Sequence, residues 1–498
     1  MKFDKKKLLY SIYSVAFVGM CLAPAILMPF TESENSKENK LPSKAPKIKT
    51  EDGKLNFEFF SEFEDYFSEH FAFRESLVTL DGKLRSELFG TSSNEDVIVG
   101  REGWLFYEPT AGDFMNCSVL SDRAVNNIIR NLLLLDDYCE SQNALFTFTI
   151  APNKNSIYPE FMPYNYIESD NPGNYDKFLT AYSEIKEEWH KAVISSDGNV
   201  KIPEFFSFCD LRKTLLQSKE ANEAPIYHKT DTHWNNIGAL AARNALINLS
   251  DVTDGFHDSS WSIRNDWSGD LAEMLYPSDV PMDNQYYTDH EFKYQYSGRV
   301  RGLDDINIQT VCESPSVTSG EPFKKLLMYR DSFGEAILPF MAESFSSAEF
   351  TRAVPYNTSS ITEDMFVVLE IVERNLGNLQ KYAPIMPAPI YEESLPEIKF
   401  FSDSAYIQAE EKENYWHIYG ELGDEFFKDE SAKIFVTYNG VTYESFNCFE
   451  DKLLGREGET SDNGFSLYIP KGEGQQLPAE NEISITVVSG NGETVKYN

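Results

Sequence analysis

Residues 227–234, with the sequence YHKTDTHW, combine an imidazole and a carboxylate at a spacing that suits acid–base chemistry. A helix is predicted over residues 236–249, so these residues form the loop that enters it. In such an Asp-x-His pair the Asp231 carboxylate can orient the His233 ring and stabilise its protonated form, as in a catalytic triad. This spacing is common by chance, so the pair needs a nucleophile from elsewhere in the chain.

A candidate nucleophile, Ser332, follows a short apolar strand in the sequence LLMYRDSFG, residues 326–334. Ser332 occupies the turn after that strand, and a helix is predicted over residues 333–344. Such a turn exposes the hydroxyl and directs helix N-terminal amides towards it, which serves both a nucleophile and an oxyanion hole. The simpler alternative is that Ser332 only caps the helix.

Other polar side chains follow buried strands. Asn153 and Lys154 come after a strand predicted over residues 144–150, and Glu373 and Arg374 come after a later one. Ligands of open α/β sheets bind beyond the carboxyl ends of the strands, so these side chains are candidates for the same crevice. An ordinary polar loop and an inter-strand ion pair are the alternatives.

A metal site is a competing interpretation of the first segment. His228, Asp231 and His233 offer two imidazoles and a carboxylate, which suits zinc, but their spacing matches no strong zinc motif. His228 is better explained as a pocket-lining or solvent-exposed residue. We therefore expect no metal and no nucleotide cofactor.

The elements that position these segments alternate between strand and helix. Helices are predicted over residues 122–142 and 175–193 on either side of the strand at 144–150, and further strands over 324–329 and 365–372. This order predicts a parallel α/β sheet.

Residues 55–89 carry apolar side chains at helical spacing. They include Phe59, Phe60, Phe63 and Phe67, and then Leu77, Leu80, Leu84 and Leu88. We interpret them as stripes of helices that face a hydrophobic core.

The pattern changes after a proline-rich break at residues 383–389. Short alternating runs at residues 433–438, 465–469 and 482–488 follow, with Asn-Gly turn signals between or after them. They predict an all-β, sandwich-like module over residues 396–498.

The N-terminus predicts a membrane segment. Lysines at residues 5–7 precede an uncharged stretch, residues 8–30, which is long enough to span a bilayer with the lysines in the cytoplasm. A cleaved signal peptide and a lipoprotein at Cys21 are alternatives, but residues 23–25 make a poor cleavage site. The rest of the chain is then expected outside the cell, beginning with a polar linker over residues 31–55.

Composition excludes some classes of function. The chain has 498 residues, of which 41% are hydrophobic, and a net charge of −36. Its length and apolar content fit a folded protein of more than one domain. An acidic chain repels the phosphate backbone, so we expect no nucleic-acid partner. The five cysteines after the membrane segment are too sparse and odd in number for a disulfide framework.

Four motifs, taken in order, resemble the extracellular DHHW protein family and, more distantly, the alginate O-acetyltransferases of the SGNH-hydrolase superfamily. They are GREGWLFY at 100–107, IAPNKNSIYPE at 150–160, YHKTDTHWNNIGA at 227–239 and LLMYRDSFGEAILPFMAESF at 326–345. The resemblance implies a flavodoxin-like three-layer α/β/α SGNH-hydrolase domain, here residues 56–385. It also implies a triad in which Ser332 is the nucleophile, His233 the general base and Asp231 its orienting partner.

The sequence departs from the family pattern in two places. Thr232 stands where the DHHW tetrad has its first histidine, and Arg330 stands where the usual Gly-Asp-Ser turn has glycine. Arg330 is therefore a candidate for binding an acidic sugar or an acyl oxygen. Asn153 is a candidate second oxyanion donor beside the Ser332 amide, and the other expected site-lining residues are Lys154, Trp234 and His228.

These expectations combine into a membrane-anchored, extracytoplasmic serine O-acetyltransferase or acetylesterase that acts on a polysaccharide through acetyl-Ser332. Transfer implies a partner membrane acyltransferase that delivers the acetyl group, whereas hydrolysis does not. The alternative is a non-catalytic surface protein that binds carbohydrate or assembles the envelope on a degenerate hydrolase fold. The module at residues 396–498 is a candidate carbohydrate-binding module in both cases.

Overall fold

The computed structural model describes residues 5–30, 43–50, 52–195, 205–249, 260–316, 323–423, 430–450, 461–472 and 476–497. Residues 1–4 of the expected membrane segment, and residues 31–42 and 51 of the expected linker, lie outside the described residues. The described chain mixes helices with several sheets, in agreement with the predicted α/β class.

A seven-stranded sheet forms the centre of the protein, in the order β4-β3-β11-β9-β10-β8-β7. The first five strands of this order are parallel, and β8 and β7 extend one edge in antiparallel fashion. The central strand β11 is buried at every position, as a parallel strand covered on both faces must be. The strands are β3 (Leu145–Ala151), β4 (Ser207–Cys209), β7 (Gln295–Tyr296), β8 (Asn307–Val311), β9 (Lys325–Tyr329), β10 (Ser347–Thr351) and β11 (Met365–Val372).

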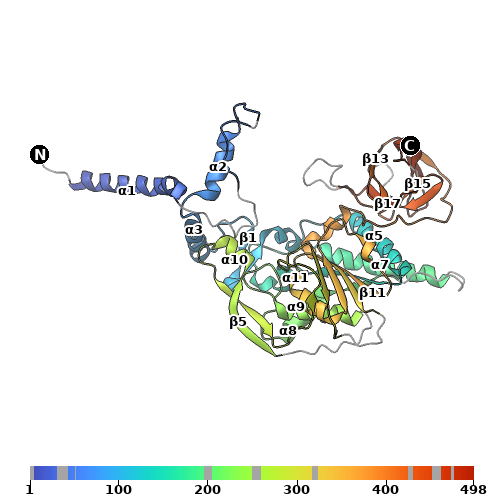
Figure 1. Ribbon diagram of the computed structural model, residues 1–498, viewed down its shortest axis with the longest axis horizontal. Coiled ribbons are helices and arrows are strands. Elements are labelled where there is room, and N and C mark those ends of the chain that lie inside the picture. The colour runs from blue at the N-terminus through green and yellow to red at the C-terminus, as the bar shows by residue number, and fades with distance from the viewer. Residues whose placement is uncertain are drawn as a thin grey trace.

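Helices cover both faces of this sheet (Figure 1). Alternate side chains of one strand point to opposite faces, so Leu326 of β9 packs in one hydrophobic cluster and Leu327 in the other. The first cluster includes side chains of α8 (Leu211–Ala221), α9 (Asn236–Leu249) and α11 (Gly334–Ser344), and the second those of α5 (Asp122–Ser141) and α7 (Asn174–Ser195). Helices α5, α7, α9 and α11 and strands β3, β9 and β11 lie within one or two residues of the ranges that the sequence predicts. The predicted ranges do not include α8 or the strands β4, β7, β8 and β10.

Short elements connect the sheet to its surroundings. They are β1 (Val97–Val99), β2 (Leu105–Tyr107), α4 (Ala111–Phe114), α6 (Lys154–Ile157), β5 (Trp261–Ser268), α10 (Asp270–Leu275) and β6 (Met282–Thr288). β1 and β2 pair as an antiparallel hairpin, and β5 pairs with β6 in a second two-stranded sheet.

From residue 400 onward the described chain consists mainly of strands in two sheets, ordered β12-β19-β18-β15-β16 and β13-β14-β17. Their inner side chains share one hydrophobic cluster. The strands are β12 (Phe400–Ser402), β13 (Ala405–Glu411), β14 (Tyr415–Leu422), β15 (Lys433–Tyr438), β16 (Val441–Glu444), β17 (Gly464–Pro470), β18 (Ile483–Val488) and β19 (Thr494–Tyr497).

A buried amide network joins these C-terminal strands to helix α5. The Asn447 backbone N–H donates to Asn131 Oδ1 at 2.9 Å, and Asn131 Nδ2 donates to the Asn447 carbonyl at 3.1 Å. Phe446 and Tyr468 also pack into the hydrophobic cluster that contains α5 and α7. The C-terminal strands are therefore fixed against the α/β part by core contacts, because buried polar groups are costly unless they are paired.

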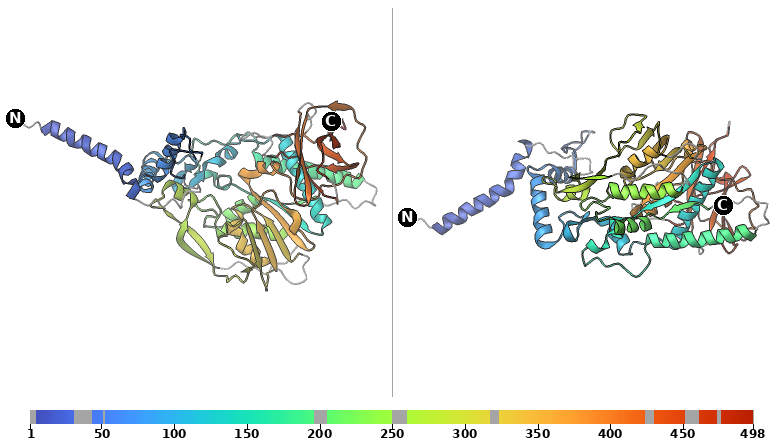
Figure 2. Two further views of the ribbon diagram at one scale, coloured as in Figure 1. Left: turned by 45° about the horizontal axis from the view of Figure 1, so that its top comes forward. Right: turned by 90° about the horizontal axis from the view of Figure 1, so that it is seen from below.

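Helix α1 (Lys5–Leu27) projects from the body of the protein (Figure 2). Leu9–Phe30 is long and apolar enough to cross a membrane and buries no side chains in the described structure.

The prediction that the apolar stripes of residues 55–89 face a core is wrong. These residues form α2 (Phe59–His70) and α3 (Arg74–Phe89) as helices, but Phe60 is 82% exposed and Leu88 is 69% exposed. Helix α3 instead turns Thr79 and Gly82 towards the body. Helical periodicity identifies a face of a helix, but it does not say what that face meets.

Candidate active site

Ser332 lies in the turn between β9 and α11, and the side chain of Asp331 holds this turn. One Asp331 oxygen accepts the Phe333 N–H at 2.9 Å, and the other accepts the Val372 N–H at 2.7 Å. The turn is thus tied to the end of the neighbouring strand β11. Ser332 remains half-buried and accessible at the surface of the site.

His233 is positioned by the loop that enters α9. The His228 backbone N–H donates to the His233 carbonyl at 3.2 Å, which closes the loop. Asn235 Oδ1 then accepts the N–H groups of Ile237 and Gly238, so its side chain caps the helix directly after the loop.

The two loops bring the three residues of the predicted triad together. His233 Nε2 is 2.8 Å from Ser332 Oγ, and His233 Nδ1 is 2.7 Å from Asp231 Oδ1. The second Asp231 oxygen accepts N–H groups from the Trp267 indole at 3.0 Å and from the Asp270 backbone at 3.2 Å. Both Asp231 oxygens are therefore occupied, and the carboxylate cannot rotate away from the ring.

The charges in the site favour an ionised Asp231 and a basic His233. Burial opposes the charge of Asp231, but the hydrogen bond from His233 and the ring's charge outweigh it and lower the pKa of this carboxyl. Burial also opposes a charged His233, but its hydrogen bond to Asp231 and that carboxylate's charge raise the pKa of the ring. An ionised Asp231 places the ring proton on Nδ1, which leaves Nε2 free to accept the Ser332 hydroxyl proton.

Asp270 is a second carboxylate beside the ring that the sequence did not single out. Its Oδ2 is 3.8 Å from His233 Nδ1 and accepts the Thr232 hydroxyl at 2.6 Å. Asp231, His233 and Asp270 also form the group of described residues whose donor atoms lie close enough together to hold a metal ion. His228 is not in this group. The three residues considered as a metal site from the sequence, His228, Asp231 and His233, are therefore not the three that lie together.

Asn153, a candidate second oxyanion donor from the sequence, has another hydrogen-bond partner in the structure. Asn153 is fully buried, and its Nδ2 donates to Asp113 Oδ2 at 3.3 Å. Its amide donor is thus directed to a carboxylate. The Ser332 backbone N–H, in contrast, makes no hydrogen bond to any residue that the structure describes.

Arg330 is buried, and its guanidinium is directed into the protein. It donates to the carbonyls of Leu303 and Asp305 and lies 3.9 Å from Glu335. A Cβ at Gly334 would meet the Arg330 side chain at 2.6 Å, so glycine at the start of α11 makes room for this arginine. The structure does not place Arg330 where it could bind an acidic sugar.

Lys154 clamps the loop that carries the triad. Its ammonium group is buried and donates to the carbonyls of His228, Lys229 and Asp231 at 3.2, 3.0 and 2.6 Å. Burial lowers the pKa of Lys154 to about 8, against a partial opposing effect of nearby carboxylates. Lys154 therefore positions the loop and does not face a substrate.

We expect Lys154→Met to lower the free energy of unfolding by about 3 kcal/mol, because it leaves the buried carbonyls of His228 and Asp231 without a donor. The Lys229 carbonyl loses one donor but keeps the Leu105 N–H at 2.8 Å. Urea unfolding of the full chain in detergent measures this loss. Lys229→Met is the matched control, since the half-buried Lys229 side chain makes no such bonds, and its unfolding should change by at most about 0.5 kcal/mol. Equal losses in both variants would contradict the clamp.

Trp234 and His228 are buried beneath the site. The Trp234 indole N–H donates to the Phe333 carbonyl at 3.0 Å, which links the histidine loop to the serine turn. The His228 ring stacks on Trp267, with centroids 4.7 Å apart, and burial lowers its pKa to about 4. Because Trp267 donates to Asp231, both residues support the triad from below and do not line an open pocket.

Arg374 is the residue of this site whose place the sequence left open. Its guanidinium lies 5.5 Å from the ring centroid of Phe333 and 5.4 Å from that of Tyr107, and it is half-buried. It forms no hydrogen bond or ion pair with any described residue, whereas Glu373 accepts the Asn153 N–H at 2.8 Å. The ion pair considered from the sequence is therefore not formed, and Arg374 presents its donors at the edge of the site. The sequence feature that pointed to Arg374 as a site residue was its position directly after a buried strand.

Comparisons with known proteins give solved structures that are similar to this chain. Bacillus cereus PatB1 with a sulfonyl adduct is 16% identical, and the match covers 57% of this chain and 97% of that chain with a TM-score of 0.40. A DHHW family protein from Eubacterium siraeum is 14% identical over 57% of this chain and 96% of that one, with a TM-score of 0.39. The family that the sequence motifs resemble is thus among the similar structures.

The O-acetyltransferase domain of Pseudomonas putida AlgJ is also similar. It is 17% identical over 56% of this chain and 92% of that chain, with a TM-score of 0.31. No protein-family model matches the chain, and the search of curated proteins finds no match. We base the function proposed below on the geometry of the site.

Proposed function

We propose that this chain is an extracytoplasmic serine O-acetyltransferase or acetylesterase that acts on a polysaccharide. The observation that carries this proposal is the hydrogen-bonded path from Ser332 Oγ through His233 to Asp231, with distances of 2.8 and 2.7 Å. Residues 56–385 would form a flavodoxin-like three-layer SGNH-hydrolase domain. Residues 1–30 would be its membrane anchor, 31–55 its linker and 396–498 a β-sandwich module.

In the first half-reaction, His233 Nε2 removes the Ser332 hydroxyl proton while Ser332 Oγ attacks the acetyl carbonyl carbon of a donor ester. The ester C–O bond breaks, the leaving alcohol takes the proton from His233, and acetyl-Ser332 remains. In the second half-reaction His233 deprotonates an acceptor, which attacks the acyl-enzyme and releases Ser332. A sugar hydroxyl as acceptor gives transfer, and water gives hydrolysis.

Two groups are suited to stabilise the negative oxygen that forms on the acetyl group. One is the Ser332 backbone N–H, which has no partner among the described residues. The other is the Arg374 guanidinium, which lies beside the Phe333 ring and has no hydrogen-bond acceptor among the residues that the structure describes. Donors that are already in place cost no reorganisation when the charge develops.

The acetyl donor would be delivered by a partner membrane acyltransferase in the case of transfer. The helix at Leu9–Phe30 is long and apolar enough to hold the chain at the same membrane.

The test is to incubate the full chain in detergent with an activated acetyl ester, with and without an oligosaccharide acceptor, and to locate acetyl groups by mass spectrometry. We expect acetyl on Ser332, and none at this position in Ser332→Ala. Acetyl on the sugar as well identifies a transferase, and free acetate identifies an esterase. A chelator arm addresses the Asp231, His233 and Asp270 group, and we expect acetylation to be unchanged by it. A folded chain that never acquires acetyl would overturn the proposal.

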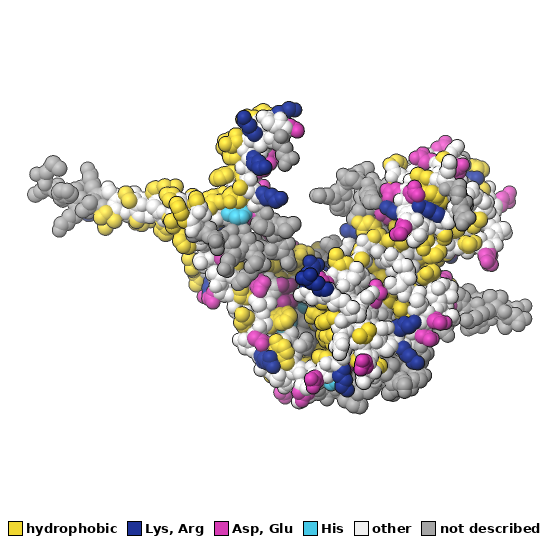
Figure 3. Space-filling model, in the orientation of Figure 1, with side chains coloured by type: hydrophobic (Ala, Val, Ile, Leu, Met, Phe, Trp, Pro, Cys, Tyr) yellow, Lys and Arg dark blue, Asp and Glu magenta, His cyan; other side chains and the backbone are white. Residues whose placement is uncertain are grey.

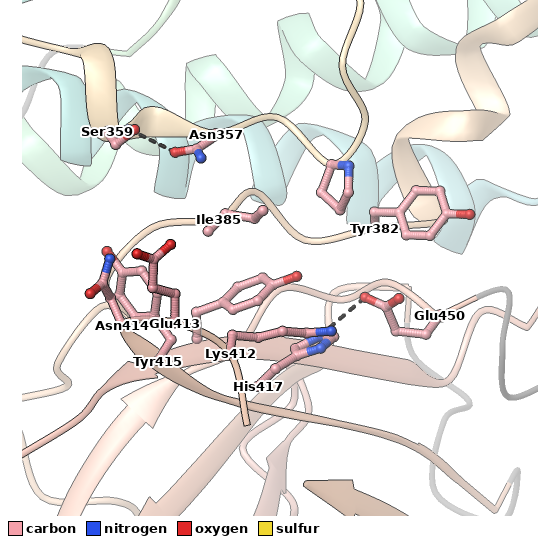
Figure 4. A pocket seen from close by; sticks show the side chains of 12 residues that line it. Asn357, Ser359, Tyr382, Ile385, Lys412, Glu413, Asn414, Tyr415, His417 and Glu450 are labelled. Atoms are coloured by element: carbon pink, nitrogen blue, oxygen red, sulfur yellow. Dashed lines mark hydrogen bonds and ion pairs between the residues drawn. The ribbon is translucent and has the colours of Figure 1, made fainter. Parts of the chain in front are cut away.

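The binding alternative is favoured by one observation, a cavity of about 440 Å³ between the α/β part and the C-terminal strands (Figure 4). Its lining includes the rings of Tyr382, Tyr415 and Tyr468 and the carboxylates of Glu413 and Glu450. Aromatic faces with a few polar groups suit a sugar ring, which has both apolar and hydroxyl-bearing sides. Binding of a neutral oligosaccharide that Tyr415→Ala weakens, together with an inert Ser332, would favour this alternative over the enzyme.

A further inference from the structure

Helix α3 presents its leucines to solvent. Leu77, Leu80, Leu84 and Leu88 lie on one face and are 44% to 69% exposed, and Phe73 before the helix is 55% exposed. A helix of a soluble domain normally turns such a stripe towards the core. An exposed apolar stripe of this length marks a surface that contacts something else.

The opposite face of α3 is small and polar, and it is this face that packs on the body. Thr79 Oγ1 accepts the Ser278 backbone N–H at 2.9 Å, and Ser86 Oγ accepts the Tyr276 hydroxyl at 2.9 Å. A Cβ at Gly82 would lie 2.4 Å from the Leu275 carbonyl, so α3 packs closely against α10. These contacts fix the orientation of α3 and leave its leucines facing outward.

Helix α2 continues the apolar surface with phenylalanine rings. Phe59, Phe63 and Phe67 stack along one side, with successive ring centroids 6.2 and 6.3 Å apart. Phe60 and Phe57 are the most exposed rings of this region. We call this set of exposed side chains on α2 and α3 the apolar surface.

The apolar surface adjoins the helix that is apolar enough to cross a membrane. The Ala72 N–H, in the turn between α2 and α3, donates to the Pro24 carbonyl near the end of α1 at 3.1 Å. Both helices run across the direction of α1 and not along it (Figures 1 and 2). Hydrophobic side chains continue from α1 onto α2 in the space-filling view (Figure 3).

If α1 crosses a bilayer, helices that run across its end lie parallel to the membrane surface. An amphipathic helix in this position buries its apolar face at the boundary between headgroups and acyl chains. Acidic residues outnumber basic ones between residues 59 and 89, so attraction to anionic lipids is not what would hold these helices there. Burial of the apolar surface would supply the attraction instead, and neutral lipid would suffice.

We infer that α2 and α3 lie in the outer surface of the membrane that α1 crosses, with Leu77, Leu80, Leu84, Leu88, Phe60 and Phe63 inserted among the lipids. This inference rests on the membrane location in the proposed function. It goes beyond that location, because it gives the extracytoplasmic part a second attachment and a fixed orientation. A chain held only by a flexible linker would leave the active site free to rotate relative to the bilayer.

The test uses the full chain in phosphatidylcholine nanodiscs with a spin label at one introduced cysteine. Cys21 and Cys117 are the exposed cysteines and are first replaced by serine. Labels at Leu80→Cys and Phe63→Cys should collide several-fold more with oxygen, which concentrates in lipid, than with a water-soluble nickel reagent. The matched control is Asp65→Cys, on the other side of α2, where we expect the reverse order.

A second variant makes the result independent of one label position. Leu80→Glu with Leu84→Glu changes only exposed side chains, and it should move the Phe63→Cys label from lipid to water. If the chain enters nanodiscs but the labels at residues 63 and 80 contact only water, α1 is an anchor and the inference is wrong. The inference is also wrong if both reagents are excluded, because protein then covers the surface. A chain that does not enter nanodiscs at all overturns the membrane location itself.

Discussion

Asp231→Asn is expected to lower kcat for acetyl transfer or hydrolysis by about four orders of magnitude, the scale found when a triad aspartate is replaced. One Asp231 oxygen accepts two N–H groups, from Trp267 and from the Asp270 backbone. In the variant we expect the asparagine oxygen to take that position, because an NH₂ group there would meet two fixed donors. At the other position it meets one fixed donor, the His233 backbone N–H, and a ring nitrogen that can give up its proton. The NH₂ group then faces His233 Nδ1 and forces the ring proton onto Nε2, which can no longer accept the Ser332 proton.

Single-turnover measurement of Ser332 acetylation tests this expectation, and Asp270→Asn is the matched control. Asp270 Oδ2 is 3.8 Å from His233 Nδ1, compared with 2.7 Å for Asp231, so its loss should cost less than about tenfold. Asp270 contributes to the raised pKa of His233, so the acidic limb of the pH–rate profile should move to lower pH in this control. Equal losses in the two variants would show that Asp231 does not orient the ring.

Arg374→Gln is expected to lower kcat by about 10²- to 10³-fold, the usual cost of removing one donor to a developing oxyanion. The same change should move the acidic limb of the pH–rate profile to higher pH. The reason is that the Arg374 charge lowers the pKa of His233, so its removal lets that pKa rise further. The base must be neutral to act, and neutrality then requires a higher pH.

Arg374→Lys separates the two effects of the arginine. Lysine keeps the positive charge, so the pH limb should stay in place, but it lacks the planar fork of donors, so kcat should still fall. Arg352→Gln is a matched control, because Arg352 is paired with Glu335 at 3.0 Å. An unchanged kcat and pH limb in Arg374→Gln would remove Arg374 from the site.

Much of the candidate site could be predicted from the sequence because its signals are local. Asp231 and His233 are two residues apart in one loop, and Ser332 lies in a strand–turn–helix unit that its neighbours specify. The helices and strands that carry these residues also follow from periodicity within short windows. Local signals therefore singled out these residues, the resemblance to the DHHW family implied that they form a triad, and the structure places them within hydrogen-bond distance.

Tertiary structure decided what the flanking side chains do, since that depends on partners far away in the chain. Lys154 is occupied by the carbonyls of residues 228–231, and Arg330 by those of Leu303 and Asp305, so neither is available to a substrate. Arg374 is available because it forms no hydrogen bond or ion pair with any residue that the structure describes. The sequence shows the charge of each residue, but not the acceptors that folding brings to it.

The sequence likewise does not show what the apolar stripes of α2 and α3 contact in the folded chain. By itself the sequence determined that residues 55–89 form helices with one apolar face, because periodicity is a property of the chain alone. Only the tertiary structure decided that Thr79 and Gly82 pack on the body while the leucines face outward, because close packing against α10 needs small side chains. Which face of an amphipathic helix is buried is determined by the surface it meets, and that surface is formed by residues two hundred positions later in the chain.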